Sequence, residues 1–395
     1  MENEMRSFIM AWTIVLASLT YCYYISSRIP IGKIRLLSIL PIIPIFALLP
    51  LSFSSVFLQF YIGMLIGWLA NFKLLLFAFG RLDNTHSFLQ FIVATALPIR
   101  IKPNLSQHIQ KEKTSPTSSS TEKSPKLLNM SFVLHTLLWY VLVQMYATNN
   151  VYKQHIFFTK PIAVHLLYTF RMALGIQIMF CAYAALAKLL LRQEVEPQFD
   201  KPFLPTSVQN FWGKRWNLSV SSLLKSTIYE PTKTLVTPIF GKRWTTQVAV
   251  FATFVVSGMM HELLHFYVGR QWPTGEAMWY YIIQGVCVAI EVELKKNALI
   301  GGWRQLHSGI SIPLTVGFTV VTGAWLGYAE LITFRADIRE IEEYAAFVNY
   351  VKHGLQIPWA SLVSRKFCSL IITTPFGPNK NGLGRPVSVR PVSKL

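Results

Sequence analysis

Long unbroken blocks of apolar residues restrict the fold of this chain more than any other feature. A helix needs about 20 apolar residues to cross the hydrocarbon core of a bilayer, and most blocks reach that length. The longest one exceeds a single span and is interrupted by Pro41, Pro44 and Pro50, so it predicts two helices joined near residues 50–55. The blocks cover residues 8–26, 36–79, 127–147, 162–191, 248–267, 278–292 and 310–332. They predict an all-α, polytopic membrane protein with about eight transmembrane helices.

The chain carries a formal net charge of +19, which in a soluble protein would suggest a nucleic-acid partner. Here the basic residues lie in short segments between apolar blocks and not on one soluble face. Counting the crossings puts four basic segments on the same side of the membrane: residues 28–35, 100–126, 192–246 and 295–296. Lys and Arg collect on the cytosolic side of membrane proteins. The charge pattern therefore predicts a lipid bilayer around the chain, a cytosolic basic face and no nucleic-acid partner.

Composition divides the chain into one large domain and a tail. We expect a single transmembrane domain over residues 1–354 and a C-terminal extension over residues 355–395. Within the domain, residues 99–127 are rich in Lys, Ser, Thr and Pro, a composition that cannot bury a core and predicts a flexible cytosolic loop. Residues 192–246 are aromatic and basic and too polar to cross the bilayer, so we expect them at the membrane interface, which Trp and Tyr favour.

Polar groups inside a span are costly, so each one is a candidate functional group. The run Ser257-Gly-Met-Met-His-Glu-Leu-Leu-His265 ends an otherwise apolar helix. Its residues 261–265 match the H-E-x-x-H pattern of zinc metalloproteases, but no third ligand with a supporting signature follows. His261 could instead act as a metal-free general base, since a neutral imidazole can accept a proton near neutral pH. A structural histidine bonded to a neighbouring helix is the third interpretation.

A second polar motif, Asn210-Phe-Trp-Gly-Lys-Arg-Trp-Asn217, lies in the interfacial segment. Thr206 and Gln209 have the spacing of a capping box, which predicts that a helix begins there. On such a helix Trp212 and Trp216, four residues apart, would share one face.

The remaining residues of this motif suggest a ligand. Gly213 and Asn217 would share a second helix face, and the missing side chain of Gly213 would leave room for a ligand beside Asn217. Lys214 and Arg215 would lie at the cytosolic boundary, where they could meet the phosphates of a soluble acyl carrier. The same composition is also typical of an interfacial aromatic and basic anchor without catalytic function.

Taken together, the two motifs resemble the signature of the plant wax synthase family, which belongs to the membrane-bound O-acyltransferases. Four other segments are similar to that family: Tyr21-Cys-Tyr-Tyr24, Trp68-Leu-Ala-Asn-Phe-Lys-Leu-Leu-Leu-Phe77, Gly285-Val-Cys287 and Glu342-Glu-Tyr-Ala-Ala-Phe347. The resemblance extends over residues 1–351. His265 departs from it, because an aromatic or apolar residue is expected there, so the H-E-x-x-H pattern is completed by coincidence. The loop at residues 114–126 and the C-terminal extension are longer than in the family.

The resemblance implies an acyl-CoA-dependent O-acyltransferase of the endoplasmic reticulum membrane. Its acceptor would be a membrane-dissolved long-chain fatty alcohol, with a sterol or diacylglycerol as alternatives. Acyl-CoA would be the co-substrate, with no cofactor and no metal. The resemblance implies that His261 is catalytic and that Asn217 orients the thioester or stabilises the oxyanion. The residues expected to bind acyl-CoA are Trp212, Gly213, Lys214, Arg215 and Trp216.

Two further residues are expected close to His261. Glu262 matches the family pattern. On the next span, Tyr281, Gln284, Val288 and Glu291 fall on one face, and Gln284 could bond His261 or simply make a polar contact between helices. The alternatives from other classes are an intramembrane zinc metalloprotease built on residues 261–265 and a non-enzymatic lipid transporter.

Overall fold

The structure is a computed structural model that describes residues 2–82, 87–102, 125–148, 161–301 and 306–355. Within this part of the chain the regular elements are helices, and the β-structure amounts to one isolated antiparallel bridge between Ile101 and Val195. The all-α prediction is confirmed. The predicted loop and the predicted extension lie mostly outside the described residues, which stop at residue 102, resume at residue 125 and end at residue 355.

Six helical segments among the described residues are long and apolar enough to cross a membrane. They are Glu2–Arg28, Val56–Ala78, His165–Leu191, Arg243–Gly269, Glu276–Lys296 and Ser308–Gly327. A seventh span results if Lys33–Ile39 and Ile42–Ser52, bent by 42° against each other, count as one broken span. Large apolar side chains such as Leu37, Leu189 and Leu314 are exposed on these helices, as expected where a chain contacts lipid.

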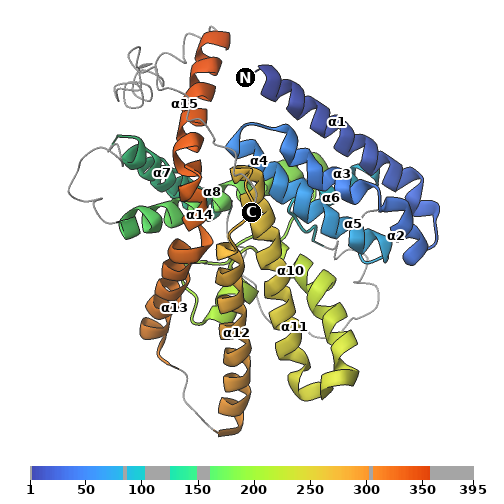
Figure 1. Cartoon of the computed structure of the whole chain (residues 1–395), viewed down its shortest axis with the longest axis vertical. Coiled ribbons are helices and arrows are strands. Elements are labelled where there is room, and N and C mark those ends of the chain that lie inside the picture. Colours follow the sequence, from blue (N-terminus) through green and yellow to red (C-terminus); the bar gives the residue numbers. More distant parts are fainter. Residues whose placement is uncertain (1, 83–86, 103–124, 149–160, 302–305, 356–395) are drawn as a thin grey trace, which may run out of the picture.

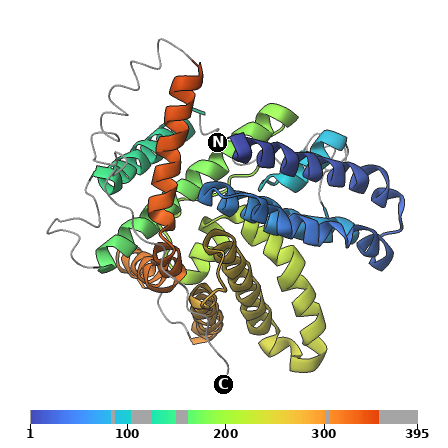
Figure 2. The same ribbon diagram turned by 45° about the horizontal axis from the view of Figure 1, so that its top comes forward.

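The N-terminal part of the chain, the described residues from 2 to 96, forms a layer of short and long helices around one buried span (Figures 1 and 2). The predicted break near residues 50–55 is confirmed, because η2 ends at Ser52 and the hydroxyl of Ser55 caps the next helix by accepting from the amide of Leu58 (3.2 Å). The elements are α1 (Glu2–Tyr24), η1 (Ser26–Arg28), α2 (Lys33–Ile39), α3 (Ile42–Leu48), η2 (Leu49–Ser52), α4 (Val56–Ile62), the π-helical η3 (Gly63–Ala70), α5 (Asn71–Ala78) and α6 (Phe88–Ala96).

The span α4–η3–α5 is the centre of the fold, since 89% of its apolar window is buried inside the protein. Its buried polar side chains Gln59, Asn71 and Lys73 each donate to backbone carbonyls. Lys73 donates from Nζ to the carbonyls of Ala94 (2.6 Å) and Leu97 at the C-terminus of α6, where the helix dipole favours a cation. Asn71 donates from Nδ2 to the carbonyls of Ile43 (3.1 Å) and Gly67 (3.0 Å).

The described residues from 125 onward carry most of the longer helices. The elements there are α7 (Pro125–Thr148), α8 (Pro161–Leu191), α9 (Val208–Asn210), η5 (Phe211–Arg215), α10 (Leu218–Leu224), η6 (Lys225–Tyr229), α11 (Glu230–Gly269), α12 (Glu276–Gly301), α13 (Ser308–Thr322), η7 (Gly323–Gly327), α14 (Ala329–Thr333) and α15 (Ala336–Leu355). Helix α11 is broken at Gly241, whose φ of 68° and ψ of 169° reverse the chain. Its two limbs form the yellow hairpin at the lower right of Figure 1.

The second limb of α11 and helix α12 lie side by side in both views (Figures 1 and 2). Glycines permit this approach. A Cβ atom on Gly285 of α12 would lie 2.7 Å from Cβ of Phe254, and one on Gly258 of α11 would lie 2.7 Å from Sδ of Met278. Small residues at the contact between membrane helices allow their backbones to come close. This contact brings the histidine-bearing face of α11 against α12.

Helix α15 is fixed to the rest of the bundle by two carboxylates. Glu340 forms a buried ion pair with Arg171 of α8 (2.7 Å). Glu343 accepts from the hydroxyl of Ser55 (2.7 Å) and from the amides of Val56 (2.7 Å) and Phe57 (3.1 Å), so it completes the N-terminal cap of α4. The predicted domain boundary at residue 354 therefore falls at the end of a helix that packs into the domain.

Candidate active site

One cavity of about 1050 Å³ lies between the central span and helices α8, α11 and α12. Both polar residues singled out in the sequence, His261 and Asn217, line it. The two are contributed by different elements, because His261 lies near the end of α11 and Asn217 immediately precedes α10. The cavity lining contains polar side chains and many aromatic ones, among them Trp68, Phe211, Trp212, Trp216, Tyr280 and Tyr281.

Both nitrogens of the His261 ring have partners. Nδ1 lies 2.7 Å from the carbonyl oxygen of Ser257, one turn earlier on α11. A carbonyl can only accept, so Nδ1 carries the proton and Nε2 presents its lone pair. Nε2 accepts from the hydroxyl of Tyr281 at 2.8 Å. The Tyr281 ring also stacks on the imidazole, with 4.2 Å between ring centroids and 29° between planes. In its neutral form the imidazole is therefore held in the tautomer that is protonated at Nδ1.

The aromatic motif folds differently from the predicted helix. The cap is Ser207 and not Thr206, because the Ser207 hydroxyl accepts from the amide of Asn210 (3.1 Å). The turns that follow are π-helical and end at Arg215, so Trp216 is extended and lies beyond the helix. The predicted helix face shared by Trp212 and Trp216 is therefore wrong, although both side chains line the cavity.

Asn217 has an unusual backbone conformation that explains why this residue type stands there. Its φ of 42° and ψ of 65° place it in the left-handed region, which Asn tolerates better than most residues. Its Oδ1 accepts from the amide of Val220 (3.3 Å), so the residue is the N-cap of α10. The predicted face shared with Gly213 is wrong for the same reason. The predicted room beside Gly213 is present, because a Cβ atom there would meet nothing within 4 Å.

Gln284 does not bond His261. Its Oε1 accepts from the indole nitrogen of Trp212 (3.1 Å) and its Nε2 donates to the hydroxyl of Thr322 (3.0 Å). The residue that reaches the imidazole is Tyr281, three positions earlier on the same predicted face. Gln284 therefore joins the aromatic motif to α12 and joins α12 to the end of α13. This is the polar helix–helix contact that the sequence predicted as its alternative role.

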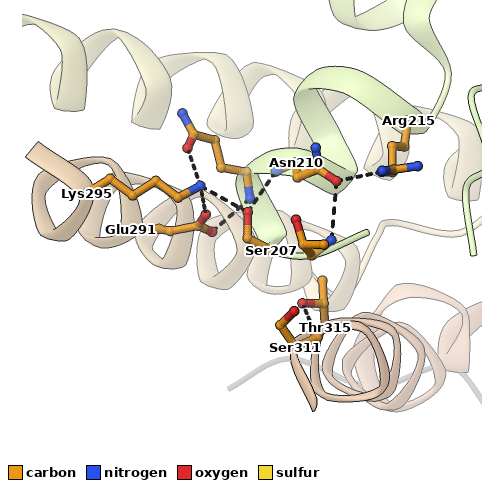
Figure 3. A network of polar contacts seen from close by, with 9 residues as sticks. Ser207, Asn210, Arg215, Glu291, Lys295, Ser311 and Thr315 are labelled. Atoms are coloured by element: carbon orange, nitrogen blue, oxygen red, sulfur yellow. Dashed lines mark hydrogen bonds and ion pairs between the residues drawn. The ribbon is translucent and has the colours of Figure 1, made fainter. Parts of the chain in front are cut away.

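The start of the aromatic motif is fastened to α12 as well, through the polar network of Figure 3. Lys295 donates to Ser207 Oγ (3.1 Å) and Gln209 Oε1 (2.9 Å), and it pairs with Glu291 (2.5 Å). Glu291 in turn accepts from the amide of Gln209 (2.9 Å). Together with the Trp212–Gln284 bond, this network sets the position of α9 and η5 relative to the helix that carries Tyr281.

The basic residues of the motif lie outside the cavity lining. Arg215 is used within its own segment, where Nε donates to Asn210 Oδ1 (2.5 Å) and Nη1 donates to the carbonyl of Asp200 (3.3 Å). Lys214 is exposed and does not line the cavity. Lys225 and Lys233, on η6 and the first limb of α11, do line it. Sequence reasoning missed these two lysines because the hairpin that folds them back toward the cavity is not visible as a motif.

The three polar residues of the H-E-x-x-H pattern have separate partners. His261 contacts Tyr281 and Ser257, as described above, whereas His265 is buried and bonds Glu330 Oε2 through Nδ1 (2.8 Å). Glu262 accepts from the amide of Met278 (2.6 Å) at the start of α12, so it caps that helix. In the part of the chain that the structure describes, no group of three or more His, Cys, Asp or Glu is arranged to hold a metal ion.

Comparison with known proteins identifies the family. The family model described as "Membrane bound O-acyl transferase family" matches residues 195–283, which include both polar motifs. The chain is 36% identical over 358 residues to probable long-chain-alcohol O-fatty-acyltransferase 3 of Arabidopsis thaliana, covering 89% of this chain and 97% of that protein. The chain belongs to the membrane-bound O-acyltransferase family.

Two further relatives of this acyltransferase bear on its substrates. The long-chain-alcohol O-fatty-acyltransferase of Simmondsia chinensis is 35% identical over 361 residues, 90% of this chain and 97% of that protein. The acyl-CoA–sterol O-acyltransferase 1 of Arabidopsis thaliana is 37% identical over 347 residues, 87% of this chain and 95% of that protein. The resemblance to the wax synthase family and the assignment as an acyltransferase are confirmed.

Proposed function

We propose that this acyltransferase moves the acyl group of a fatty acyl-CoA to the hydroxyl of a long-chain alcohol in the endoplasmic reticulum membrane and so makes a wax ester. The observation that carries the proposal is that His261 and Asn217, from separate elements, line one cavity. The cavity volume of about 1050 Å³ lies at the upper end of the range of about 300–1,000 Å³ that is typical of small-molecule pockets, as expected for a lipid-like substrate.

In this proposal His261 is the general base. The lone pair of Nε2 receives the proton of the alcohol while the alcohol oxygen attacks the thioester carbonyl. The carbon–sulfur bond then breaks, and the CoA thiolate leaves readily because the pKa of a thiol is about 8.5. The proton held by His261 returns to the departing sulfur. The aromatic lining keeps water from hydrolysing the thioester.

Asn217 is proposed to stabilise the oxyanion that forms at the thioester carbonyl. Its Oδ1 is held by the amide of Val220, which directs the side-chain amide and keeps Nδ2 available as a donor. None of the hydrogen bonds found among the described residues uses Nδ2. A single donor of this kind contributes about 2.7–4 kcal/mol to transition-state stabilisation in other enzymes.

The charged part of acyl-CoA is proposed to lie near Lys225 and Lys233, since these lysines line the same cavity as His261. The acyl chain would follow the aromatic lining. A sterol acceptor is the second candidate, supported by the 37% identity to the sterol acyltransferase of Arabidopsis thaliana. That value is close to the 35% identity to the Simmondsia chinensis enzyme, so overall similarity does not favour either acceptor.

Product analysis tests the proposal. The chain would be expressed in a host that lacks neutral-lipid synthesis, and its microsomes would receive labelled acyl-CoA with long-chain alcohols, sterols or diacylglycerol. We expect labelled wax ester from the wild type and none from His261→Ala, with equal amounts of inserted protein. Labelled sterol ester without wax ester would show that the acceptor is a sterol and not a long-chain alcohol. Equal activity of wild type and His261→Ala would refute the proposed base.

A further inference from the structure

The nitrogen of His261 that must accept the proton is already covered by a neighbouring side chain. Nε2 lies 2.8 Å from the hydroxyl of Tyr281, and Nδ1 is engaged by the carbonyl of Ser257. A substrate alcohol therefore finds no open lone pair on the imidazole. Either the phenol moves away before reaction or it takes part in the proton transfer.

The surroundings of Tyr281 oppose movement of its ring. The residue is 8% exposed. Its ring stacks on His261 at 4.2 Å and contacts Tyr280 at 5.0 Å and Trp212 at 5.7 Å between centroids. Trp212 is itself held by its bond to Gln284. Swinging the phenol out would break the stack, the hydrogen bond and the packing against two aromatic neighbours at once.

The Tyr281 hydroxyl can also accept a second hydrogen bond. A phenol oxygen has one proton to donate and lone pairs to accept with. While its proton is directed at Nε2, the lone pairs remain for a donor in the cavity, which Tyr281 lines. An alcohol that enters the cavity can thus donate to the Tyr281 oxygen without displacing it.

We propose that the Tyr281 hydroxyl contacts the acceptor alcohol and carries its proton to His261, an inference that rests on the acyl transfer proposed above. As the alcohol O–H bond breaks, its proton binds the Tyr281 oxygen, and the original Tyr281 proton moves to Nε2. The alcohol oxygen forms the ester bond to the thioester carbon, and the carbon–sulfur bond breaks. The imidazolium then returns a proton through Tyr281 to the CoA thiolate, so Tyr281 and His261 end unchanged.

Tyr281→Phe tests this relay, since it keeps the stacked ring and removes only the hydroxyl. We expect kcat to fall about 100-fold, the lower range for loss of an acid–base group, with the KM for acyl-CoA within about twofold of wild type. The matched control is Tyr267→Phe, which removes another buried phenol hydroxyl of the same helix pair. Tyr267 bonds the carbonyl of Ala47 (2.6 Å) and does not line the cavity, so its activity should stay near wild type.

The outcomes separate the relay from the acyl transfer itself. If Tyr281→Phe is as active as wild type while His261→Ala is inactive, the relay is wrong and His261 accepts the proton directly. If His261→Ala is active, the proposed role of His261 in acyl transfer is wrong, and the relay that depends on it is wrong as well. A proton inventory in H₂O–D₂O mixtures needs no variant. A curve that requires two protons in flight supports the relay, and a straight line for one proton overturns it even if Tyr281→Phe should not fold.

Discussion

The indole ring of Trp68 meets the imidazole of His261 edge to face, with 5.2 Å between ring centroids and 73° between their planes. Trp68 belongs to η3 of the central span, whereas His261 lies near the end of α11. With Tyr281 stacked on it from α12, the imidazole is enclosed by aromatic rings from two other spans. The position of the proposed base therefore depends on the packing of three helices and not on its own helix alone.

Trp68→Phe should separate this packing from hydrogen bonding. The indole Nε1 of Trp68 is buried without a partner among the described residues, and the residue lines the cavity. A substrate oxygen that accepts from it would add about 0.5–1.5 kcal/mol, so we expect kcat/KM to fall by up to about tenfold. Some loss of thermal stability is expected as well, because Phe leaves part of the buried indole volume unfilled.

Trp12→Phe is the matched control for that experiment. Its indole Nε1 is likewise buried without a partner among the described residues, but Trp12 lies on α1 and does not line the cavity. Activity losses of equal size in both variants would show that the effect is one of packing, and the substrate contact of Trp68 would be refuted.

Substitutions of Asn217 should separate its structural role as the N-cap of α10 from its proposed role as the oxyanion donor. Asp keeps an N-cap acceptor and tolerates the left-handed backbone, so Asn217→Asp should retain the melting temperature. It replaces the Nδ2 donor by a carboxylate oxygen, and we expect kcat to fall about 100- to 1000-fold. Asn217→Ala should lose activity and in addition about 0.5–2 kcal/mol of stability with the cap. A fully active Asn217→Asp enzyme would assign the residue a purely structural role.

The sequence was sufficient to predict the helical membrane fold, because the span signal depends only on length and apolarity. It also pointed to His261, whose polarity stands out in an apolar span, whereas the role of Asn217 was implied by the resemblance to the wax synthase family. The break before α4 was visible because proline and serine mark it locally. The predicted number of about eight spans is close to the six or seven found among the described residues, and the bent pair Lys33–Ile39 and Ile42–Ser52 makes the difference between these two counts.

The partners of the site residues could not be predicted in the same way. Tyr281 and not Gln284 reaches His261 because of the way α12 is rotated and positioned against α11. The close glycine contacts at residues 258 and 285 set this arrangement. The left-handed backbone of Asn217 was not predicted either, because the face predicted for Gly213 and Asn217 assumed a continuous α-helix. The π-helical turns of η5 shift every later side chain off that face.

Charge substitutions should show where the phosphates of acyl-CoA bind. Lys225→Gln and Lys233→Gln should each raise the KM for acyl-CoA up to about tenfold, as expected for one charged hydrogen bond, and leave kcat nearly unchanged. The effect should shrink at high salt, because added ions screen exposed charges. Lys214→Gln is the comparison, since Lys214 is exposed outside the cavity lining. A larger KM effect at Lys214 would restore the sequence-based assignment.

A methyl group on Gly285 should push α11 and α12 apart. Its Cβ would lie 2.7 Å from Cβ of Phe254, and such overpacking costs about 1–3 kcal/mol. We expect Gly285→Ala to lower the melting temperature in detergent and to lower kcat, because Tyr281 lies on the same helix one turn away. Gly317→Ala on α13 is the control, since its Cβ would meet nothing within 4 Å. It should be neutral or slightly stabilising, and equal losses in both variants would exclude the helix contact as the cause.

The pair of His265 and Glu330 tests whether the H-E-x-x-H pattern has a structural or a metal-binding role. The Glu330 carboxylate is buried, bonded to His265 and to the amide of Thr274 (2.9 Å). His265→Phe leaves Oε2 of Glu330 without its histidine partner, and breaking a buried pair in this way costs about 3–5 kcal/mol of stability. We expect a lower melting temperature, but wild-type kcat for the folded fraction. Loss of activity at unchanged stability, together with loss of bound zinc, would instead favour a metal site.

The acid stability of the same pair gives an independent measurement. Burial raises the pKa of Glu330, but the hydrogen bonds from His265 and Thr274 outweigh it and leave the pKa below its ordinary value of 4.5. A carboxyl with a lowered pKa in the folded state stabilises the protein above the ordinary value, and this contribution disappears as the pH falls through the folded pKa. The melting temperature of the wild type should therefore fall below about pH 4.5. Glu330→Gln cannot titrate, so its melting temperature should lack that part of the decline. Parallel curves for the two proteins would mean that Glu330 is not held ionised by His265.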